Sequence, residues 1–174
     1  MSTDLQTDLE HLNLLPASEV ENQLLKCCGS REWATRLLAE RPFENMADVA
    51  AKADRIWWSL ASPDWLEAFH SHPKIGEKKA AAATSLDAQK WSADEQSGIR
   101  DSALETMEAL AELNRAYEEK FGYIFIVCAS GKTSEEMLAI LRSRLENDAD
   151  QELRIAAAEQ ARITELRLKK LIDN

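Results

Sequence analysis

The sequence is short of residues that interrupt helices and short of positive charge. Five glycines and four prolines in 174 residues leave long uninterrupted stretches, in which alanine, leucine, glutamate and arginine dominate. The 21 lysines and arginines are outnumbered by 31 aspartates and glutamates, which gives a net charge of -10. Binding a polyanion needs clustered cations. The composition therefore favours a helical protein and argues against a nucleic-acid partner.

Cysteine and long hydrophobic runs are scarce as well. The three cysteines, Cys27, Cys28 and Cys128, show no C-x-x-C spacing or disulfide framework, which fits a reducing compartment. No apolar run approaches the about 20 residues that span a bilayer. The acidic N-terminus is unlike a secretory or transit signal, and the C-terminus carries no peroxisomal address. We therefore expect a cytoplasmic protein without a membrane partner.

The remaining composition is that of a globular protein. Hydrophobic residues make up 45% and charged residues 30% of the chain, and the length suits one hydrophobic core. We expect a single domain spanning residues 1–174. Its predicted fold class is all-α, an irregular bundle of about seven to nine helices with no significant sheet.

Caps and apolar periodicity mark the helices. Ser18 and Glu21 form a capping-box pattern at the start of a helix that Gly29 closes. Further helices are predicted over residues 30–42, 46–60, 64–70, 92–120, 133–145 and 150–171. Ser30 starts the first of these, Ser62-Pro63 opens the helix over 64–70, and Thr133 with Glu136 caps the helix over 133–145. Residues 72–91 are interpreted as a loop or a broken helix. Residues 122–129 have a β-like composition without a pairing partner, which indicates a buried extended segment or a helix start.

A histidine stands at the start of the predicted loop, in the sequence SHPKIGE at residues 71–77. Histidine titrates near neutrality without perturbation, and Pro73 biases His72 away from helical backbone angles. His72 is therefore either a loop histidine that caps a helix or an acid–base group. A metal site of His70, His72 and Glu77 is disfavoured, because closed zinc sites usually need four ligands.

The sequence SADEQ at residues 92–96 stands at a predicted helix start. Its plainer interpretation is a capping box, with Ser92 and Glu95 satisfying each other's backbone amides. A helix N-terminus also attracts anions. In that case Glu95 could accept a proton from a substrate or orient His72.

Arg167 lies among apolar positions of the last predicted helix. Residues on its face are Leu153, Ala156, Gln160, Ile163 and Leu171. A core-facing arginine is costly unless a carboxylate or a ligand pairs with it. Either Arg167 forms a buried ion pair, with Glu95 or Glu105, or its planar fork binds a carboxylate or ureido group.

The apolar run Phe125–Ala129 also has two interpretations. Its composition favours plain core packing. Irregular backbone, however, often exposes amides that bind an oxyanion or a carbonyl, here near residues 129–131.

Four stretches, taken in order, resemble the family of 2-oxo-4-hydroxy-4-carboxy-5-ureidoimidazoline (OHCU) decarboxylases. They are HPKIG at 72–76, SADEQ at 92–96, FGYIFIVCASG at 121–131 and ELRIAAAEQARITELRL at 152–168. The resemblance extends from about Leu12 to Leu171. It implies an all-α, cofactor-free, usually homodimeric carboxy-lyase that converts OHCU to CO2 and (S)-allantoin during urate degradation.

The resemblance also implies roles for individual residues. The expected catalytic residues are His72, Glu95 and Arg167. The expected substrate-binding residues are Pro73, Ser92, Gln96, Phe125, Ile126, Val127, Cys128 and Ala129. No metal ligand is implied. Two alternatives remain: a non-enzymatic helical interaction module built on the tryptophan-rich residues 30–65, and a metal-assisted hydrolase using His70, His72 and Glu77.

Overall fold

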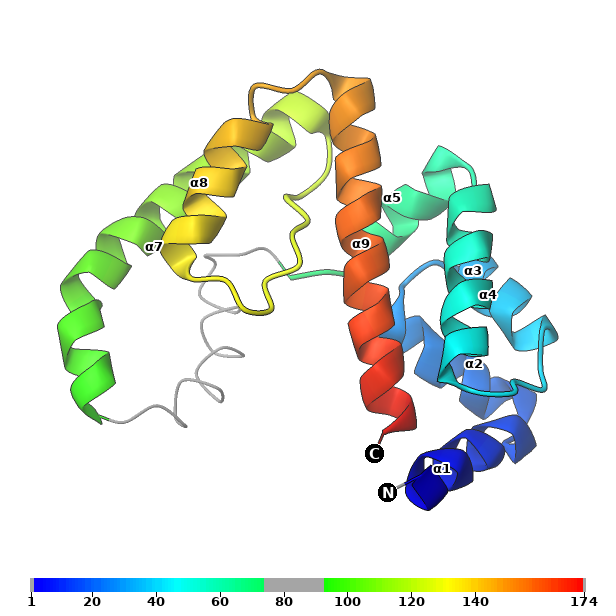
Figure 1. Cartoon of the computed structure of the whole chain (residues 1–174). Helices are drawn as coiled ribbons and strands as arrows, with labels where there is room; N and C mark the ends of the chain where they lie inside the picture. Colours follow the sequence, from blue (N-terminus) through cyan, green and yellow to red (C-terminus); the bar gives the residue numbers. More distant parts are fainter. Residues whose placement is uncertain (1, 74–92, 174) are drawn as a thin grey trace. The chain divides into compact units, whose positions relative to one another are not determined.

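Helices make up the regular structure of this chain in a computed structural model that describes residues 2–73 and 93–173 (Figure 1). Within those residues there are eight helices and no strand, which confirms the all-α prediction. Their bounds are α1 Ser2–Leu14, α2 Ala17–Cys27, α3 Arg31–Ala39, α4 Met46–Ser59, α5 Ser62–His70, α7 Ala93–Phe121, α8 Ser134–Arg144 and α9 Ala149–Ile172. In the described ranges, no helix combines the length and the apolar character needed to cross a bilayer.

Side-chain caps set several of these helix starts, as the sequence predicted. The Ser30 side chain accepts a hydrogen bond from the Trp33 amide at 3.3 Å and begins α3. At α8 the capping box is complete. The Glu136 amide donates to Thr133 Oγ1 at 3.1 Å, and the Thr133 amide donates to Glu136 Oε2 at 2.8 Å. Each cap satisfies amides that have no partner inside the helix.

Other boundaries differ from the prediction. The Ser18–Glu21 capping box is wrong, because the Pro16 carbonyl accepts from the Glu19 and Val20 amides and starts α2 at Ala17. Helix α5 begins at Ser62 with Pro63 in its first turn, as the Ser62-Pro63 opening predicted. Helix α1 was not predicted, although its Leu9 and Leu12 are buried. Most of the predicted loop over residues 72–91 lies outside the described residues, namely its residues 74–91.

Two compact units divide the chain. Unit 1 consists of Met1–Ser71 and Ala157–Asn174. In it, α3 packs against α2, α4 and α5. The indole N–H of the buried Trp33 donates to the Ala53 carbonyl at 3.1 Å, and that of Trp57 donates to the Ala157 carbonyl at 2.9 Å. These bonds let the core hold indole rings without leaving a buried polar group unsatisfied.

Unit 2 consists of His72–Ala156, with α7 packed against α8. Residues 122–129 follow α7 and belong to no helix, so the helix-start interpretation of this segment is wrong. The fully buried side chain of Tyr117 packs against this segment. The Tyr117 ring is 5.6 Å from the Phe125 ring and 5.9 Å from the Tyr123 ring, both in edge-to-face contact. The prediction of one domain over residues 1–174 stays a prediction.

Close packing within unit 1 fixes the residue that precedes His72. Gly29, between α2 and α3, lies so near the end of α5 that a Cβ atom built on it would be 2.5 Å from Ser71 Cβ. Real Cβ atoms do not approach each other this closely, so only glycine fits here without a shift of the backbone. The chain therefore enters His72 from a tightly constrained position.

Replacing Gly29 with alanine tests this contact. We expect Gly29→Ala to lower the free energy of unfolding by about 1–3 kcal/mol, the usual cost of overpacking. The double variant Gly29→Ala with Ser71→Gly should recover most of the loss, because Ser71→Gly removes the clashing atom. Urea denaturation of the wild type, Gly29→Ala, Ser71→Gly and the double variant measures both effects. Equal stability of Gly29→Ala and wild type would contradict the packing.

The three cysteines are all free and buried. Burial raises the pKa of Cys27 and that of Cys28 to about 11. The Arg167 guanidinium at Cys27, and hydrogen bonds with the Ser30 backbone and the Thr164 side chain at Cys28, offset this only in part. A thiol with such a pKa keeps its proton as the pH rises through 9 and loses it only near 11. The thiolate is the nucleophilic form, so both side chains are poor nucleophiles at neutral pH.

Alkylation kinetics check these thiols. At pH 8, iodoacetamide should modify Cys27 and Cys28 in the folded protein at least about 100-fold more slowly than in urea, because a pKa of about 11 leaves about one thiol in a thousand ionised and burial blocks access. Peptide mass spectrometry assigns the rate to each cysteine. An alkylation rate in the folded protein within tenfold of the rate in urea would show that the thiol is accessible to solvent and would contradict its burial.

Candidate functional site

His72 is the second residue after the end of α5. Ser71, the C-cap, donates from its amide and its hydroxyl to the Ala68 carbonyl at 3.2 and 2.6 Å and terminates the helix. His72 is half-buried and Pro73 is exposed. The transition from helix to turn at His72 is therefore as predicted. His70 and His11 are exposed.

The metal alternative gains no support. Within the described part of the chain, no three His, Cys, Asp or Glu side chains form a group that could hold a metal ion. Glu77, the third member of the predicted cluster, lies outside the described residues.

The predicted SADEQ site is described only in part. Ser92 lies outside the described residues. Glu95 and Gln96 lie in the first turn of α7, where the backbone is described and the side chains are not. Their roles in substrate contact and proton transfer stay predictions.

Arg167 lies beside the buried face of α9 and not in its middle. The buried residues of this part of the helix are Ala156, Ala157, Gln160, Thr164, Leu168 and Ile172. Arg167 is half-buried, and its Nη1 donates to the carbonyls of Lys26 and Cys27 at 3.3 and 3.4 Å. It makes no ion pair within the described residues, so the ion-pair interpretation is not supported there. The C-terminal carbonyls of α2 hold the guanidinium instead.

A cavity of about 410 Å³ opens beside Arg167 in unit 1. We call it the cationic pocket, and its lining residues are Gln23, Lys26, Cys27, Arg167, Lys170 and Leu171. Three of these six carry positive charge and none carries negative charge, in a chain whose net charge is -10. Pockets for small ligands usually measure about 300–1,000 Å³. The size and charge suit a small anion.

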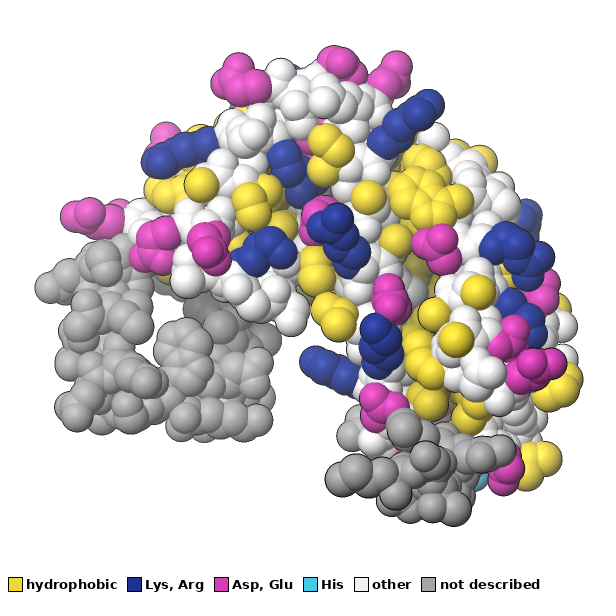
Figure 2. Space-filling view, in the orientation of Figure 1, with side chains coloured by type: hydrophobic (Ala, Val, Ile, Leu, Met, Phe, Trp, Pro, Cys, Tyr) yellow, Lys and Arg dark blue, Asp and Glu magenta, His cyan; other side chains and the backbone are white. Residues whose placement is uncertain are grey.

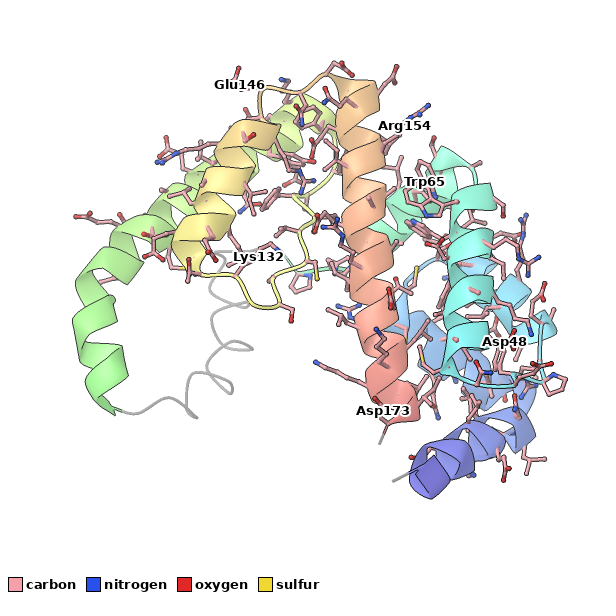
Figure 3. All side chains as sticks on the ribbon, in the orientation of Figure 1. Asp48, Trp65, Lys132, Glu146, Arg154 and Asp173 are labelled. Atoms are coloured by element: carbon pink, nitrogen blue, oxygen red, sulfur yellow. The ribbon has the colours of Figure 1, made fainter. Side chains whose placement is uncertain are left out.

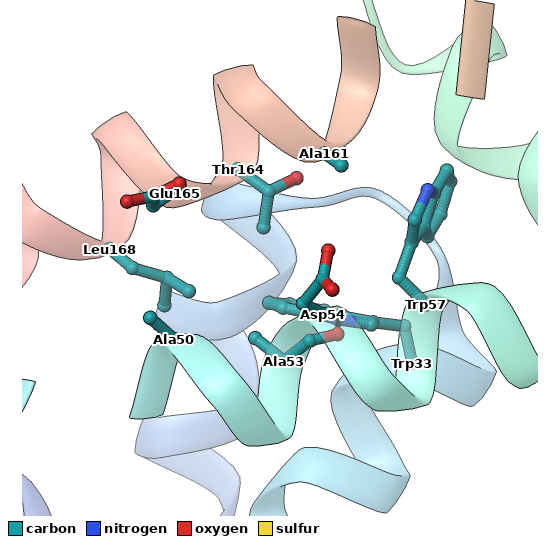
Figure 4. A pocket seen from close by; sticks show the side chains of 9 residues that line it. All are labelled: Trp33, Ala50, Ala53, Asp54, Trp57, Ala161, Thr164, Glu165 and Leu168. Atoms are coloured by element: carbon teal, nitrogen blue, oxygen red, sulfur yellow. Dashed lines mark hydrogen bonds between the residues drawn. The ribbon is translucent and has the colours of Figure 1, made fainter. Parts of the chain in front are cut away.

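A second cavity in unit 1 is much smaller, about 70 Å³. It lies between α3, α4 and α9, with Trp33 and Trp57 among its walls and the carboxylates of Asp54 and Glu165 at its rim (Figure 4). Its volume is far below that of usual ligand pockets. The cationic pocket is therefore the better candidate for binding.

The apolar segment of unit 2 has a buried backbone. Residues 123–128 are all buried, whereas Ala129 is exposed, so Ala129 differs from the other four predicted contact residues. Two cations hold the segment by its carbonyls. Arg144 Nη1 donates to the Ile126 carbonyl at 2.5 Å, and Lys132 Nζ donates to the Cys128 carbonyl at 2.8 Å. Figure 3 labels Lys132, which precedes α8.

Arg144 is itself part of a buried polar network with Glu152, Tyr117 and Asn147. Its Nε and Nη2 both lie 2.6 Å from Glu152 Oε1, and both side chains are almost fully buried. Glu152 Oε1 also accepts from the Tyr117 hydroxyl at 2.5 Å, and Oε2 accepts from Asn147 Nδ2 at 2.9 Å. Burial, with the hydrogen bond to Glu152 second, raises the pKa of Tyr117 far above its usual range. The phenol therefore stays neutral, and it donates to Glu152 and accepts from Arg144 Nη2 at 3.4 Å.

Sequence reasoning missed this network, although a signal was present. Arg144 follows Leu138 and Leu141 at spacings of three residues, so it shares the buried face of α8. Glu152 precedes Ala156 and Gln160 at spacings of four on α9 in the same way. The periodicity argument that singled out Arg167 applies to both residues.

Charged side chains are mixed over the face of the molecule seen in Figure 2, with acidic and basic groups interspersed on the described helices. Of the predicted site residues, His72 and Phe125–Ala129 belong to unit 2, and Arg167 belongs to unit 1. Phe125–Ala129 form one continuous segment of unit 2.

Comparisons with known proteins give the family. The chain is 39% identical over 155 residues to the uric acid degradation bifunctional protein of Arabidopsis thaliana, a match that covers 88% of this chain and 48% of that protein. The chain thus spans about half the length of that relative. The 2-oxo-4-hydroxy-4-carboxy-5-ureidoimidazoline decarboxylase of Amia calva is 29% identical over 80% of this chain and 79% of its own.

A solved structure agrees with the sequence relatives. The crystal structure of an OHCU decarboxylase in the presence of (S)-allantoin superposes with a TM-score of 0.69 at 39% identity, covering 86% of this chain and 96% of that one. The family model described as OHCU decarboxylase matches residues 13–169. This chain therefore belongs to the OHCU decarboxylase family.

Proposed function

We propose that the chain catalyses the decarboxylation of OHCU to (S)-allantoin and CO2 without a cofactor. The observation that carries the proposal is the match of residues 13–169 to the OHCU decarboxylase family. The OHCU decarboxylase structure that resembles this chain at 39% identity was determined with (S)-allantoin present. The relatives from Arabidopsis and Amia bear names that refer to the same reaction sequence.

The cationic pocket supports a substrate of this kind. OHCU carries a carboxylate and a ureido group, and a guanidinium binds both through paired N–H donors. Arg167 uses only Nη1 in its hydrogen bonds to described residues, which leaves Nε and Nη2 for a ligand. Lys26 adds a second positive charge to the lining of the pocket. We assign Arg167 to an anionic or ureido oxygen of the substrate.

The chemistry needs orientation and proton management more than an added electron sink. The bond between the ring carbon and the carboxylate breaks, CO2 leaves, and the electron pair forms a C=C bond to the ring carbon that bears the ureido group, while the π electrons of the C=N bond move to its nitrogen, which takes up a proton. The hydroxyl of the resulting enol then loses its proton and becomes a carbonyl, and a proton adds from one face to the carbon that bears the ureido group, which gives the S product. The enzyme contributes by aligning the carboxylate and stabilising the developing charge.

We assign the proton chemistry to His72, which would hydrogen-bond the substrate hydroxyl and carboxylate and take part in proton transfer. Glu95 would orient this histidine, and Ser92 and Gln96 would fix the ureido arm. Pro73 and the segment Phe125–Ala129 would contribute further contacts. We further propose a homodimer in the cytoplasm, and light scattering in solution tests the dimer.

Replacement of His72 tests its assignment. We expect His72→Ala to lower kcat about 100- to 10,000-fold, the usual contribution of a general acid–base group. The matched control is His70→Ala, which removes an exposed histidine two residues away and should keep near-normal turnover. Circular dichroism follows the formation of (S)-allantoin from freshly generated OHCU, after the uncatalysed decay is subtracted.

The same assay separates the enzyme from the alternatives. A folded His72→Ala protein with normal turnover would refute the role of His72. A wild-type protein that neither accelerates OHCU decay nor produces optically active allantoin would refute the proposed function and favour an interaction module. Loss of activity on exhaustive chelation would favour a metal-assisted enzyme.

Arg167 has its own matched control. We expect Arg167→Ala to lower kcat/KM by about 10- to 100-fold, because it removes hydrogen bonds from a charged donor. Arg162→Ala, on the same helix, removes an exposed arginine paired with Glu159 and should change kcat/KM less than twofold. Steady-state kinetics at constant ionic strength measure both. Equal kcat/KM for the two variants would contradict the assignment.

A further inference from the structure

The backbone of the segment 123–128 is buried without the hydrogen bonds of a helix or a sheet. Six consecutive buried residues lie outside any helix, and no strand pairs with them in the described chain. Buried amides and carbonyls need partners. Among described residues, hydrogen bonds reach this backbone at the carbonyls of Ile126 and Cys128, from Arg144 and Lys132. No described residue bonds the backbone of Phe125 or Val127.

Stability alone does not account for the ion pair that supplies one of these donors, because an apolar pair of similar volume often stabilises a core equally well. An apolar pair could not hold a carbonyl. All three guanidinium nitrogens of Arg144 are used, two on Glu152 and one on Ile126. The guanidinium carbon lies 4.7 Å from the Phe125 ring centre, which adds a cation–π contact to the same segment.

We propose that Arg144 is a positioning residue for the reaction: held by Glu152, it fixes the Ile126 carbonyl and so orients the backbone of Phe125–Ala129 toward the substrate. This inference rests on the proposed function, because it takes that segment as a substrate contact. Arg144 itself touches no substrate. The donors presented to the substrate are the backbone amides of Phe125 and Val127, which act in the manner of an oxyanion hole.

Lysine cannot reproduce this arrangement. Its ammonium is a single point charge, whereas the planar fork of arginine bonds a carboxylate and a carbonyl in fixed directions. Arg144→Lys therefore keeps a positive charge beside Glu152 and loses the hydrogen bond to the Ile126 carbonyl. Tyr117→Phe is the matched control, because it removes the buried hydrogen bond to Glu152 and the 3.4 Å contact with Arg144 Nη2, and it leaves the bond from Arg144 Nη1 to Ile126 in place.

The kinetic experiment compares these variants at a temperature where each is folded. We expect Arg144→Lys to lower kcat/KM about 10- to 100-fold, as a misplacement of substrate by about 1 Å does. Tyr117→Phe should stay within threefold of wild type, as should Leu141→Val, which thins the core on the same face of α8. Thermal unfolding gives the stability of each variant. Activity losses that simply follow stability across all three would show a structural role and overturn the proposal.

A second measurement does not depend on turnover. Hydrogen exchange read by mass spectrometry should be faster over residues 123–129 in Arg144→Lys than in Tyr117→Phe, with α7 unchanged. In the wild type, saturating (S)-allantoin should slow exchange over the same residues. If Arg144→Lys does not fold, the absence of this protection would overturn the proposal. A wild type that is inactive on OHCU, yet shows the faster exchange in Arg144→Lys, would refute the proposed function and leave Arg144 as the residue that fixes the segment.

Discussion

The ion pair between Arg144 and Glu152 is the interaction on which unit 2 is built. Removing two charges from water is costly, and the cost is met only where every donor and acceptor finds a partner. Glu152 accepts from Arg144, Tyr117 and Asn147, and Arg144 Nη1 donates to the Ile126 carbonyl. One pair of charges thereby ties α7, α8, α9 and the non-helical segment together. Loss of either partner would leave the other charge buried alone.

Local chemistry explains what could be predicted from the sequence. Ser30 and the Thr133–Glu136 box mark helix starts because a cap needs only residues within one turn of the chain. The start of α2 was missed because the Pro16 carbonyl offered the first helical bonds before Ser18 could act as a cap. The lack of a strand partner for residues 122–129 was visible from composition. How that segment is held was not.

Contacts between distant residues account for the rest. Gly29 meets Ser71 across 42 positions, the difference of 71 and 29, and nothing near either residue announces the contact. Arg144 reaches Ile126 by the same kind of long-range approach. Helical periodicity placed Arg167 near a buried face but one position from its centre, because α9 buries the stripe through Thr164 and Leu168. The periodicity of one helix cannot tell which neighbour it will meet.

Arg144 and Arg167 both bind backbone carbonyls, and the presence or absence of a counter-ion among the described residues decides what each can do. The charge of Arg144 is neutralised by Glu152 in a buried pair, so its remaining contribution is directional. Arg167 binds the Lys26 and Cys27 carbonyls and pairs with no carboxylate among the described residues. Its charge is joined by those of Lys26 and Lys170 around one pocket. In the proposed function, an anionic substrate supplies the counter-charge that Arg167 lacks among the described residues, whereas Glu152 supplies it at Arg144.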